Sequence, residues 1–209
     1  MQKKLEFIFK IVVGLTFFVP LAFFPKDFIF PFIVPKVLIF RSLTIVLLGL
    51  YIILLSSDWN RYKIRLTPLT LVVLLFLASF TVSTFLGLDW YRSFWDNHER
   101  MLGLFTVAHY VIYYLVATAV IRAWEEWKWL LRAFLLAGGI VMGIAFIQQF
   151  DNEFLLNTSA NRSAATLGNP IYVGGYGLFL VAIGGLMALK EKLNFWKIFS
   201  WLTGLVGFL

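Results

Sequence analysis

Residues 37–55 read VLIFRSLTIVLLGLYIILL, and this stretch decides the class of fold. Arg41 is its one charged residue. An α-helix needs roughly 20 predominantly apolar residues to cross the hydrocarbon core of a bilayer, and this run approaches that length. We therefore expect a helix within a membrane here.

The composition of the whole chain supports the same class. Of its 209 residues, 61% are hydrophobic and 14% are charged, whereas soluble domains are about one quarter charged. The chain has no cysteine and two histidines, which excludes disulfides and thiolate metal sites and argues against a zinc centre. The distribution of its net charge of +7 indicates membrane orientation rather than nucleic-acid binding. We expect no nucleic-acid partner, metal or cofactor.

Seven apolar runs divide the chain. They cover residues 7–24, 37–55, 69–86, 101–121, 129–150, 171–189 and 198–209. The first six approach spanning length, and the seventh is short. The sequence thus predicts an all-α polytopic membrane protein with six complete transmembrane helices and a truncated seventh. We expect residues 1–209 to form one transmembrane domain, the N-terminal fragment of a longer protein, with the first run an uncleaved signal anchor.

Lysine and arginine are unevenly divided between the two sides of this predicted topology. Twelve lie on one side: Lys3, Lys4, Lys10, Arg61, Lys63, Arg65, Arg122, Lys128, Arg132, Lys190, Lys192 and Lys197. Six lie on the other: Lys26, Lys36, Arg41, Arg92, Arg100 and Arg162. The side richer in basic residues is cytoplasmic by the positive-inside rule, so we expect a cytoplasmic N-terminus.

The predicted outer connection at residues 93–105, SFWDNHERMLGLF, is polar for so apolar a chain. It packs four ionisable residues into five positions: Asp96, His98, Glu99 and Arg100. A helix over 91–102 would place Arg92, Asp96 and Arg100 on one face at i, i+4 and i+8. Two interpretations stay open. The segment is an amphipathic connector whose charges pair with one another and with lipid headgroups, or it is a charged site at the membrane surface.

A second outer connection, residues 151–169, ends in a helix start. Asn169 suits the N-cap and Pro170 the first helical position, where no backbone N–H is needed. Arg162 lies a few residues upstream. A helix N-terminus beside an arginine can bind an anion such as phosphate. The alternative is an ordinary capped helix with a solvated arginine.

Two cations lie near the outer start of the second run. Lys36 can extend to the interface, whereas Arg41 lies about one and a half turns deeper. A cation at that depth costs a few kcal/mol unless it finds a partner, so Arg41 is either functional or part of a structural ion pair. His109, in the fourth run, is expected to be a hydrogen-bonded packing residue.

Motif patterns narrow the chemistry further. The sequence contains no P-loop, HExxH, GxSxG or DxD pattern, so nothing indicates ATP, a metal or a serine nucleophile. An outer site rich in arginine could instead hold a diphosphate through guanidinium forks. Gly139 and Gly143 form a GxxxG pattern, which favours close helix packing.

Three stretches in order resemble the O-antigen ligase and O-antigen polymerase superfamily of bacterial membrane proteins. They are FPFIVPKVLIFR at residues 30–41, RSFWDNHERMLGLF at 92–105 and RSAATLGNPIYVGGYG at 162–177. The stretch at 92–105 resembles that family's polar segment followed by R-x-x-G-L-F. The stretch at 162–177 is similar to its R-x-x-[GA]-T-x-G-N-P-N-x-x-[AG] signature, except that Ile171 stands where the family often has a further Asn.

The resemblance implies a metal-independent glycosyltransferase in the bacterial cytoplasmic (inner) membrane. Such proteins move a glycan from a polyprenyl-diphosphate carrier to a lipid, glycan or protein acceptor at the outer face, as in lipopolysaccharide and polysaccharide biosynthesis. Arginines hold the diphosphate, and the catalytic base is expected beyond residue 209. The matching positions give an ordered set of diphosphate or glycan ligands: Arg162 with Asn169 at the helix start, then Arg100 and Arg92, then Arg41 and Lys36, with Asp96, Glu99 and His98 beside them.

Two weaker expectations and two rival functions stay open. Trp95 and Tyr172 could stack on sugar rings, although both also suit the membrane interface. A transporter or flippase component for lipid-linked glycans would explain charge within the membrane. A non-catalytic membrane scaffold would tolerate loss of the arginines.

Overall fold

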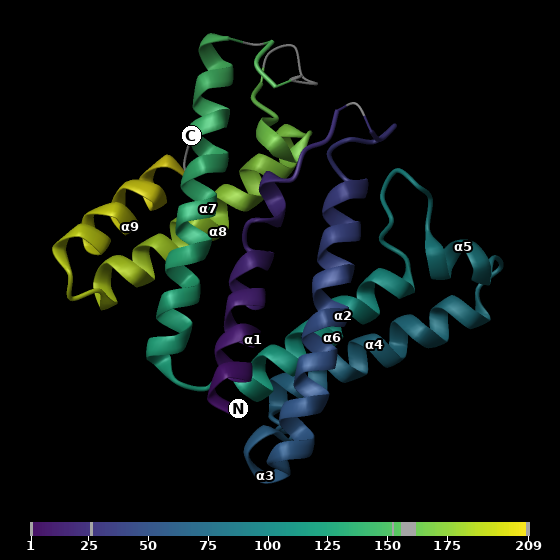
Figure 1. The fold of residues 1–209 in the computed structure, drawn as a ribbon. Helices are drawn as coiled ribbons and strands as arrows, with labels where there is room; N and C mark the ends of the chain where they lie inside the picture. The colour runs from purple at the N-terminus through teal and green to yellow at the C-terminus, as the bar shows by residue number, and fades with distance from the viewer. Residues whose placement is uncertain (1, 26, 152, 156–161, 208–209) are drawn as a thin grey trace. The chain divides into compact units, whose positions relative to one another are not determined.

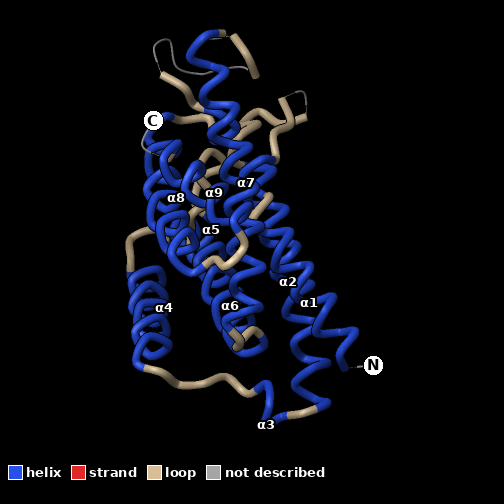
Figure 2. Tube along the Cα trace, turned by 90° about the vertical axis from the view of Figure 1, so that its left-hand side faces the viewer, coloured by secondary structure: helices blue, strands red, loops and turns tan. Residues whose placement is uncertain are grey.

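The computed structural model describes residues 2–25, 27–151, 153–155 and 162–207, and Figure 1 shows its ribbon. Its helices in chain order are α1 (Gln2–Thr16), η1 (Val19–Leu21), α2 (Val34–Ser57), α3 (Trp59–Tyr62), α4 (Pro68–Leu86), α5 (Trp90–Trp95), α6 (Leu104–Val120), α7 (Trp124–Phe150), η2 (Ala165–Leu167), α8 (Pro170–Lys190) and α9 (Asn194–Val206). Throughout these described ranges there is no β-strand (Figure 2).

Four helices are long and apolar enough to cross a membrane: α2, α4, α7 and α8. They lie on the predicted runs 37–55, 69–86, 129–150 and 171–189, so the expectation of a helical membrane protein is confirmed. The other three runs form shorter helices. The run at 101–121 becomes α6 with 17 residues, and that at 198–209 overlaps α9 with 13 residues.

The first run, 7–24, does not form one continuous helix. Helix α1 ends at Thr16, and the one-turn η1 follows around Pro20. Pro20 has no backbone N–H to donate to the carbonyl of Thr16, four residues earlier, so an α-helix cannot continue regularly through it. The expectation of one complete transmembrane helix across 7–24 is therefore wrong, whereas the uncleaved signal anchor stays a prediction.

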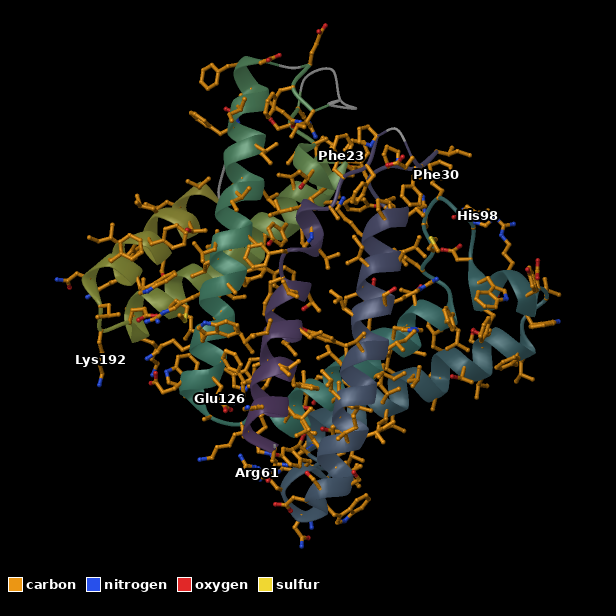
Figure 3. All side chains as sticks on the ribbon, in the orientation of Figure 1. Phe23, Phe30, Arg61, His98, Glu126 and Lys192 are labelled. Atoms are coloured by element: carbon orange, nitrogen blue, oxygen red, sulfur yellow. The ribbon has the colours of Figure 1, made fainter. Side chains whose placement is uncertain are left out.

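The chain forms two compact units. Unit 1 comprises Met1–Thr16 and Lys26–Ala123, and unit 2 comprises Phe17–Pro25 and Trp124–Leu209. In unit 1, α2 packs against α1 and α6, and α4 and α5 pack against each other and against α6. Buried residues such as Phe9, Leu47 and Leu54 form its core. Figure 3 shows Arg61 at one end of unit 1, and Phe30 and His98 toward the opposite end.

Helix α4 of unit 1 turns its apolar side chains outward. It buries Thr70 and Thr84, while Leu75, Phe76 and Val82 are exposed. A soluble helix would bury its apolar side chains against the core and expose its polar face. The arrangement of α4 instead suits a helix in contact with lipid tails.

Unit 2 packs α8 against both α7 and α9. A Cβ added at Gly184 would lie 2.7 Å from the carbonyl oxygen of Ser200, so the backbones of α8 and α9 touch there. On α7, Gly138 faces Leu180, whereas a Cβ at Gly143 would meet nothing within 4 Å. The GxxxG prediction is therefore wrong for Gly143, because the close packing of α7 runs through Gly138 on a neighbouring face. Figure 3 shows Glu126 and Lys192 at one end of this unit and Phe23 at the other.

Candidate functional site

Unit 1 contains a pocket of about 270 Å³ at the C-terminal end of α4. It is lined by Phe80, Ser83 and Thr84 from α4, Arg92 and Ser93 from α5, and Asp96, Leu102 and Gly103 from the connection that leads to α6. Two predicted site residues, Arg92 and Asp96, thus meet at one pocket. The lining residues include a cation, a carboxylate and three residues with hydroxyl groups, of which Thr84 donates its hydroxyl to the carbonyl of Phe80 at 2.8 Å.

Carboxylates hold the backbone that builds this pocket. Asp89 caps α5, its Oδ1 accepting a hydrogen bond from the backbone N–H of Arg92 at 2.9 Å. Asp96 adopts a positive φ of 62° and ends α5 after six residues. Its Oδ2 accepts a hydrogen bond from the backbone N–H of Leu102 at 2.8 Å, which closes the connection on itself.

A continuous helix over 91–102, the condition for placing Arg92, Asp96 and Arg100 on one face, does not form, because α5 ends at Trp95. A residue with positive φ breaks a right-handed helix, so Arg92, Asp96 and Arg100 do not share one helical face. Asn97 Oδ1 accepts a hydrogen bond from the backbone N–H of Arg100 at 2.9 Å. The backbone N–H groups of this connection lie outside α5 and α6 and therefore need other hydrogen-bond partners. The side chains of Asp96 and Asn97 supply two of these partners.

Gly103 is required by a close approach. A Cβ at this position would lie 2.7 Å from the carbonyl carbon of Phe94 and 2.8 Å from the backbone nitrogen of Asp96. Because real side chains do not tolerate such contacts with backbone atoms, only glycine fits here. The glycine of the R-x-x-G-L-F pattern therefore determines how α6 starts beneath the pocket.

Arg41 lies behind the connection, in α2. It is 8% exposed, and its Nη2 donates hydrogen bonds to the carbonyl of Met101, at 3.4 Å, and to Thr106 Oγ1. Its guanidinium carbon lies 4.8 Å from the ring centroid of Phe105. Its Nε is buried without a hydrogen-bond partner. Among the described residues no carboxylate forms an ion pair with Arg41, so the structural ion pair considered from the sequence is wrong, and Arg41 instead holds the start of α6.

The remaining predicted residues of unit 1 do not line the pocket. Lys36 donates to the carbonyl of Phe32, one turn earlier in the chain. His98, Glu99 and Arg100 are exposed on the connection after α5, and Figure 3 shows His98 pointing away from the helices. His109 is buried, and its Nδ1 lies 2.7 Å from the carbonyl oxygen of Phe105, which confirms it as a packing residue.

Unit 2 carries the other predicted residues. Asn169 Oδ1 accepts a hydrogen bond from the backbone N–H of Ile171 at 2.8 Å, and Pro170 occupies the first turn of α8. The predicted helix start is confirmed. Arg162 is exposed in the connection before η2. An anion site formed by Arg162 and α8 stays a prediction.

Sequence reasoning missed several polar residues at these connections. Ser83 and Thr84 of the pocket lie near the end of the apolar run 69–86, and two adjacent hydroxyl side chains there could have marked them. Gln148 is 2% exposed at the end of α7; its Nε2 donates to the carbonyl of Phe154 at 2.9 Å and its Oε1 accepts from the backbone N–H of Ala165 at 2.7 Å. The position of this amide side chain at the end of an apolar helix could have indicated that Gln148 binds the backbone of the following connection.

Among the described residues, no group of three or more histidine, aspartate or glutamate side chains is placed to hold a metal ion. No family model, curated protein or solved structure matches the chain.

Proposed function

We propose that this chain binds the donor for transfer of a glycan from a polyprenyl-diphosphate carrier, at the outer face of the bacterial cytoplasmic membrane. The observation that carries the proposal is the pocket at the end of α4, which combines Arg92, Asp96 and hydroxyl side chains. A lipid-linked donor needs such a polar pocket beside an apolar helix, because its carrier chain stays in the bilayer. The volume of about 270 Å³ lies just below the roughly 300–1,000 Å³ of sites for drug-sized ligands, which suits a headgroup rather than a whole glycan.

The proposed topology has six membrane-crossing segments, a seventh short helix and a cytoplasmic N-terminus. The first of these segments is α1 followed by η1 rather than one continuous helix. The uneven division of lysine and arginine supports this orientation. Helix α6, with 17 residues, would be about 26 Å long at 1.5 Å per residue, close to the roughly 30 Å of the hydrocarbon core. In this arrangement the pocket faces outward.

The proposed chemistry is displacement at the anomeric carbon of the donor sugar. An acceptor hydroxyl group gives up its proton to a general base or to water, and its oxygen forms the new glycosidic bond. The bond from the anomeric carbon to the diphosphate oxygen breaks, and the bonding electrons leave with the diphosphate. Negative charge grows on the departing group, so a fixed guanidinium stabilises the transition state more than the ground state. We assign this role to Arg92 and give Asp96 the binding of sugar hydroxyls. Arg162 with the start of α8 is a second candidate for the diphosphate.

A binding measurement tests the proposal. Radiolabelled undecaprenyl-diphosphate oligosaccharide is titrated against the detergent-solubilised wild type, Arg92→Ala and Arg162→Ala. The control variant is Lys192→Gln, which removes an exposed cation outside the proposed site. We expect Arg92→Ala to weaken binding about tenfold or more, in line with the roughly 1.5–3 kcal/mol of a charge-assisted hydrogen bond, and Lys192→Gln to bind as the wild type. Unchanged binding by both arginine variants would overturn the assignment.

A transporter for lipid-linked glycans is the second candidate. It is favoured by Arg41, a buried cation within a helix of spanning length, since such residues often mark a transport path. Purified protein in liposomes that moves a labelled lipid-linked glycan across the bilayer, without transfer to any acceptor, would support transport over glycan transfer.

A further inference from the structure

The end of unit 1 opposite the pocket concentrates positive charge. Arg61 lies in α3, Lys63 and Arg65 follow it, and Arg122 comes directly after α6. We call these four residues the basic cluster. They lie where α2 ends at Ser57 and α4 begins at Pro68, and both of these helices are long and apolar enough to span a membrane. The cluster therefore lies at a membrane–water interface whichever way the chain is oriented.

The fold holds the basic cluster in place. Arg122 donates from Nε to the carbonyl of Ala119 at 2.9 Å and from Nη2 to the carbonyl of Lys63 at 3.4 Å. Tyr62 is 1% exposed, and it accepts a hydrogen bond from Gln2 Nε2 at 3.2 Å and donates one to Glu6. These contacts hold α3 against α1 and the backbone of Lys63 beside Arg122, which keeps the backbone positions of the cations close together.

The nearby carboxylates are already engaged. Glu6 pairs with Arg61 at 2.6 Å, and Asp58 accepts a hydrogen bond from the backbone N–H of Arg61 at 3.0 Å as the cap of α3. Within the described part of the chain, Arg65 forms no ion pair. Burial, and then repulsion by Arg65 and Arg61, lowers the pKa of Arg122 from its ordinary value. The four cations of the cluster therefore outnumber Glu6 and Asp58, the carboxylates that contact Arg61.

Apolar side chains interleave with these cations. The sequence runs Lys63, Ile64, Arg65, Leu66, and both Ile64 and Leu66 are exposed. Trp59, exposed at the start of α3, is of the type that anchors at the headgroup level. A phospholipid carries an anionic phosphate next to acyl chains, so a single molecule can contact both the cations and the exposed apolar side chains.

We infer that the basic cluster is a binding site for the headgroup of an anionic phospholipid. Guanidinium groups match phosphate oxygens in geometry and charge. Each Lys or Arg near an anionic membrane surface contributes about 1 kcal/mol to such binding. The site is independent of donor binding, because it lies at the other end of the helices and uses none of the pocket residues.

Native mass spectrometry of the whole chain in detergent tests the inference. Phosphatidylglycerol and phosphatidylcholine with identical acyl chains are titrated against the wild type and against Lys63→Gln/Arg65→Gln, which keeps every backbone contact of Arg122. Lys192→Gln, the loss of an exposed cation in unit 2, is the matched control. We expect the wild type to prefer phosphatidylglycerol and the double variant to lose roughly 30-fold in its affinity, with the control unchanged.

Several results would overturn the inference. One is equal affinity of the wild type for the two lipids, and another is an unchanged preference in the double variant. Displacement of bound phosphatidylglycerol by millimolar inorganic phosphate would assign the cluster to a soluble anion instead. A melting temperature of the double variant equal to that of the wild type, measured in phosphatidylcholine alone, establishes that lost binding is not lost folding.

Discussion

Arg132 of α7 and Glu191, directly after α8, form a two-pronged ion pair, with Nε 2.7 Å from Oε1 and Nη2 2.6 Å from Oε2. The side chain of Glu191 is 1% exposed and that of Arg132 is 19% exposed, and the guanidinium also lies 4.8 Å from a ring centroid of Trp196 in α9. The pair thus joins the three long helices of unit 2 at one end.

Removing one partner of this pair is expected to destabilise unit 2. Glu191→Gln leaves Arg132 without its counter-charge, and breaking a buried ion pair typically costs about 3–5 kcal/mol. We expect about 3 kcal/mol, at the lower end, because Arg132 is partly exposed. Thermal unfolding in detergent measures the loss, and Lys192→Gln, one residue further on, should unfold as the wild type. Equal melting temperatures for Glu191→Gln and the wild type would mean that the pair adds nothing.

The same pair predicts a dependence of stability on pH. Hydrogen bonds from Arg132 lower the pKa of Glu191 below its ordinary value of 4.5. A carboxylate with a lowered pKa in the folded state stabilises that state above the ordinary pKa, and this contribution disappears as the pH falls through the folded-state value. Between pH 7 and pH 3, the wild type should therefore lose more stability than Glu191→Gln. Parallel pH profiles of the two proteins would contradict this linkage.

Gly103→Ala tests the close approach beneath the pocket. The added methyl group meets the carbonyl of Phe94 and the backbone of Asp96, and overpacking of this kind costs about 1–3 kcal/mol. Gly143→Ala is the matched control, because a Cβ there meets nothing within 4 Å. We expect a lower melting temperature for Gly103→Ala alone. If the two variants have the same melting temperature, the connection after α5 can accommodate the added methyl group, and the close approach of Gly103 to Phe94 does not limit it.

Arg41→Met is expected to loosen the connection without unfolding unit 1. It removes the hydrogen bonds to Met101 and Thr106 and also the buried Nε that lacks a partner. Trypsin cleavage after Arg100, which is exposed in that connection, should become roughly tenfold faster, the equivalent of about 1.4 kcal/mol of protection lost. Lys36→Met is the control, because it removes a hydrogen bond to the carbonyl of Phe32 just before α2. It should be cleaved at the wild-type rate. A wild-type rate for Arg41→Met would show that Arg41 does not hold the connection.

Features that depend on neighbouring residues could be predicted from the sequence, and features that depend on distant ones could not. The start of α8 follows from Asn169 and Pro170 alone, because capping is a local effect. The end of α5 at Asp96 depends on a hydrogen bond to Leu102 and on the approach of Gly103 to Phe94, which no periodicity encodes.

The same contrast holds for the candidate site. Arg41 could be identified as a buried cation from its position in an apolar run, but its partners lie sixty and more residues further along the chain. Ser83 and Thr84 reach the pocket because α4 packs against α5. The sequence therefore predicted Arg92 and Asp96 as site residues for their charge, but it could not show whether they share one helical face with Arg100, because the end of α5 at Trp95 depends on distant contacts.

The most direct test of the central claim is protection of the pocket by the donor. The chain has no cysteine, so Ser93→Cys places a single thiol in the pocket lining, and Asn194→Cys places one at an exposed position of unit 2 as a control. The rate of maleimide labelling of each is measured in detergent with and without saturating undecaprenyl-diphosphate oligosaccharide. The proposal predicts at least about a tenfold slower reaction at position 93 and no change at position 194, as expected for a ligand that occludes the pocket. The same labelling rate at position 93 with and without the donor would contradict donor binding in this pocket.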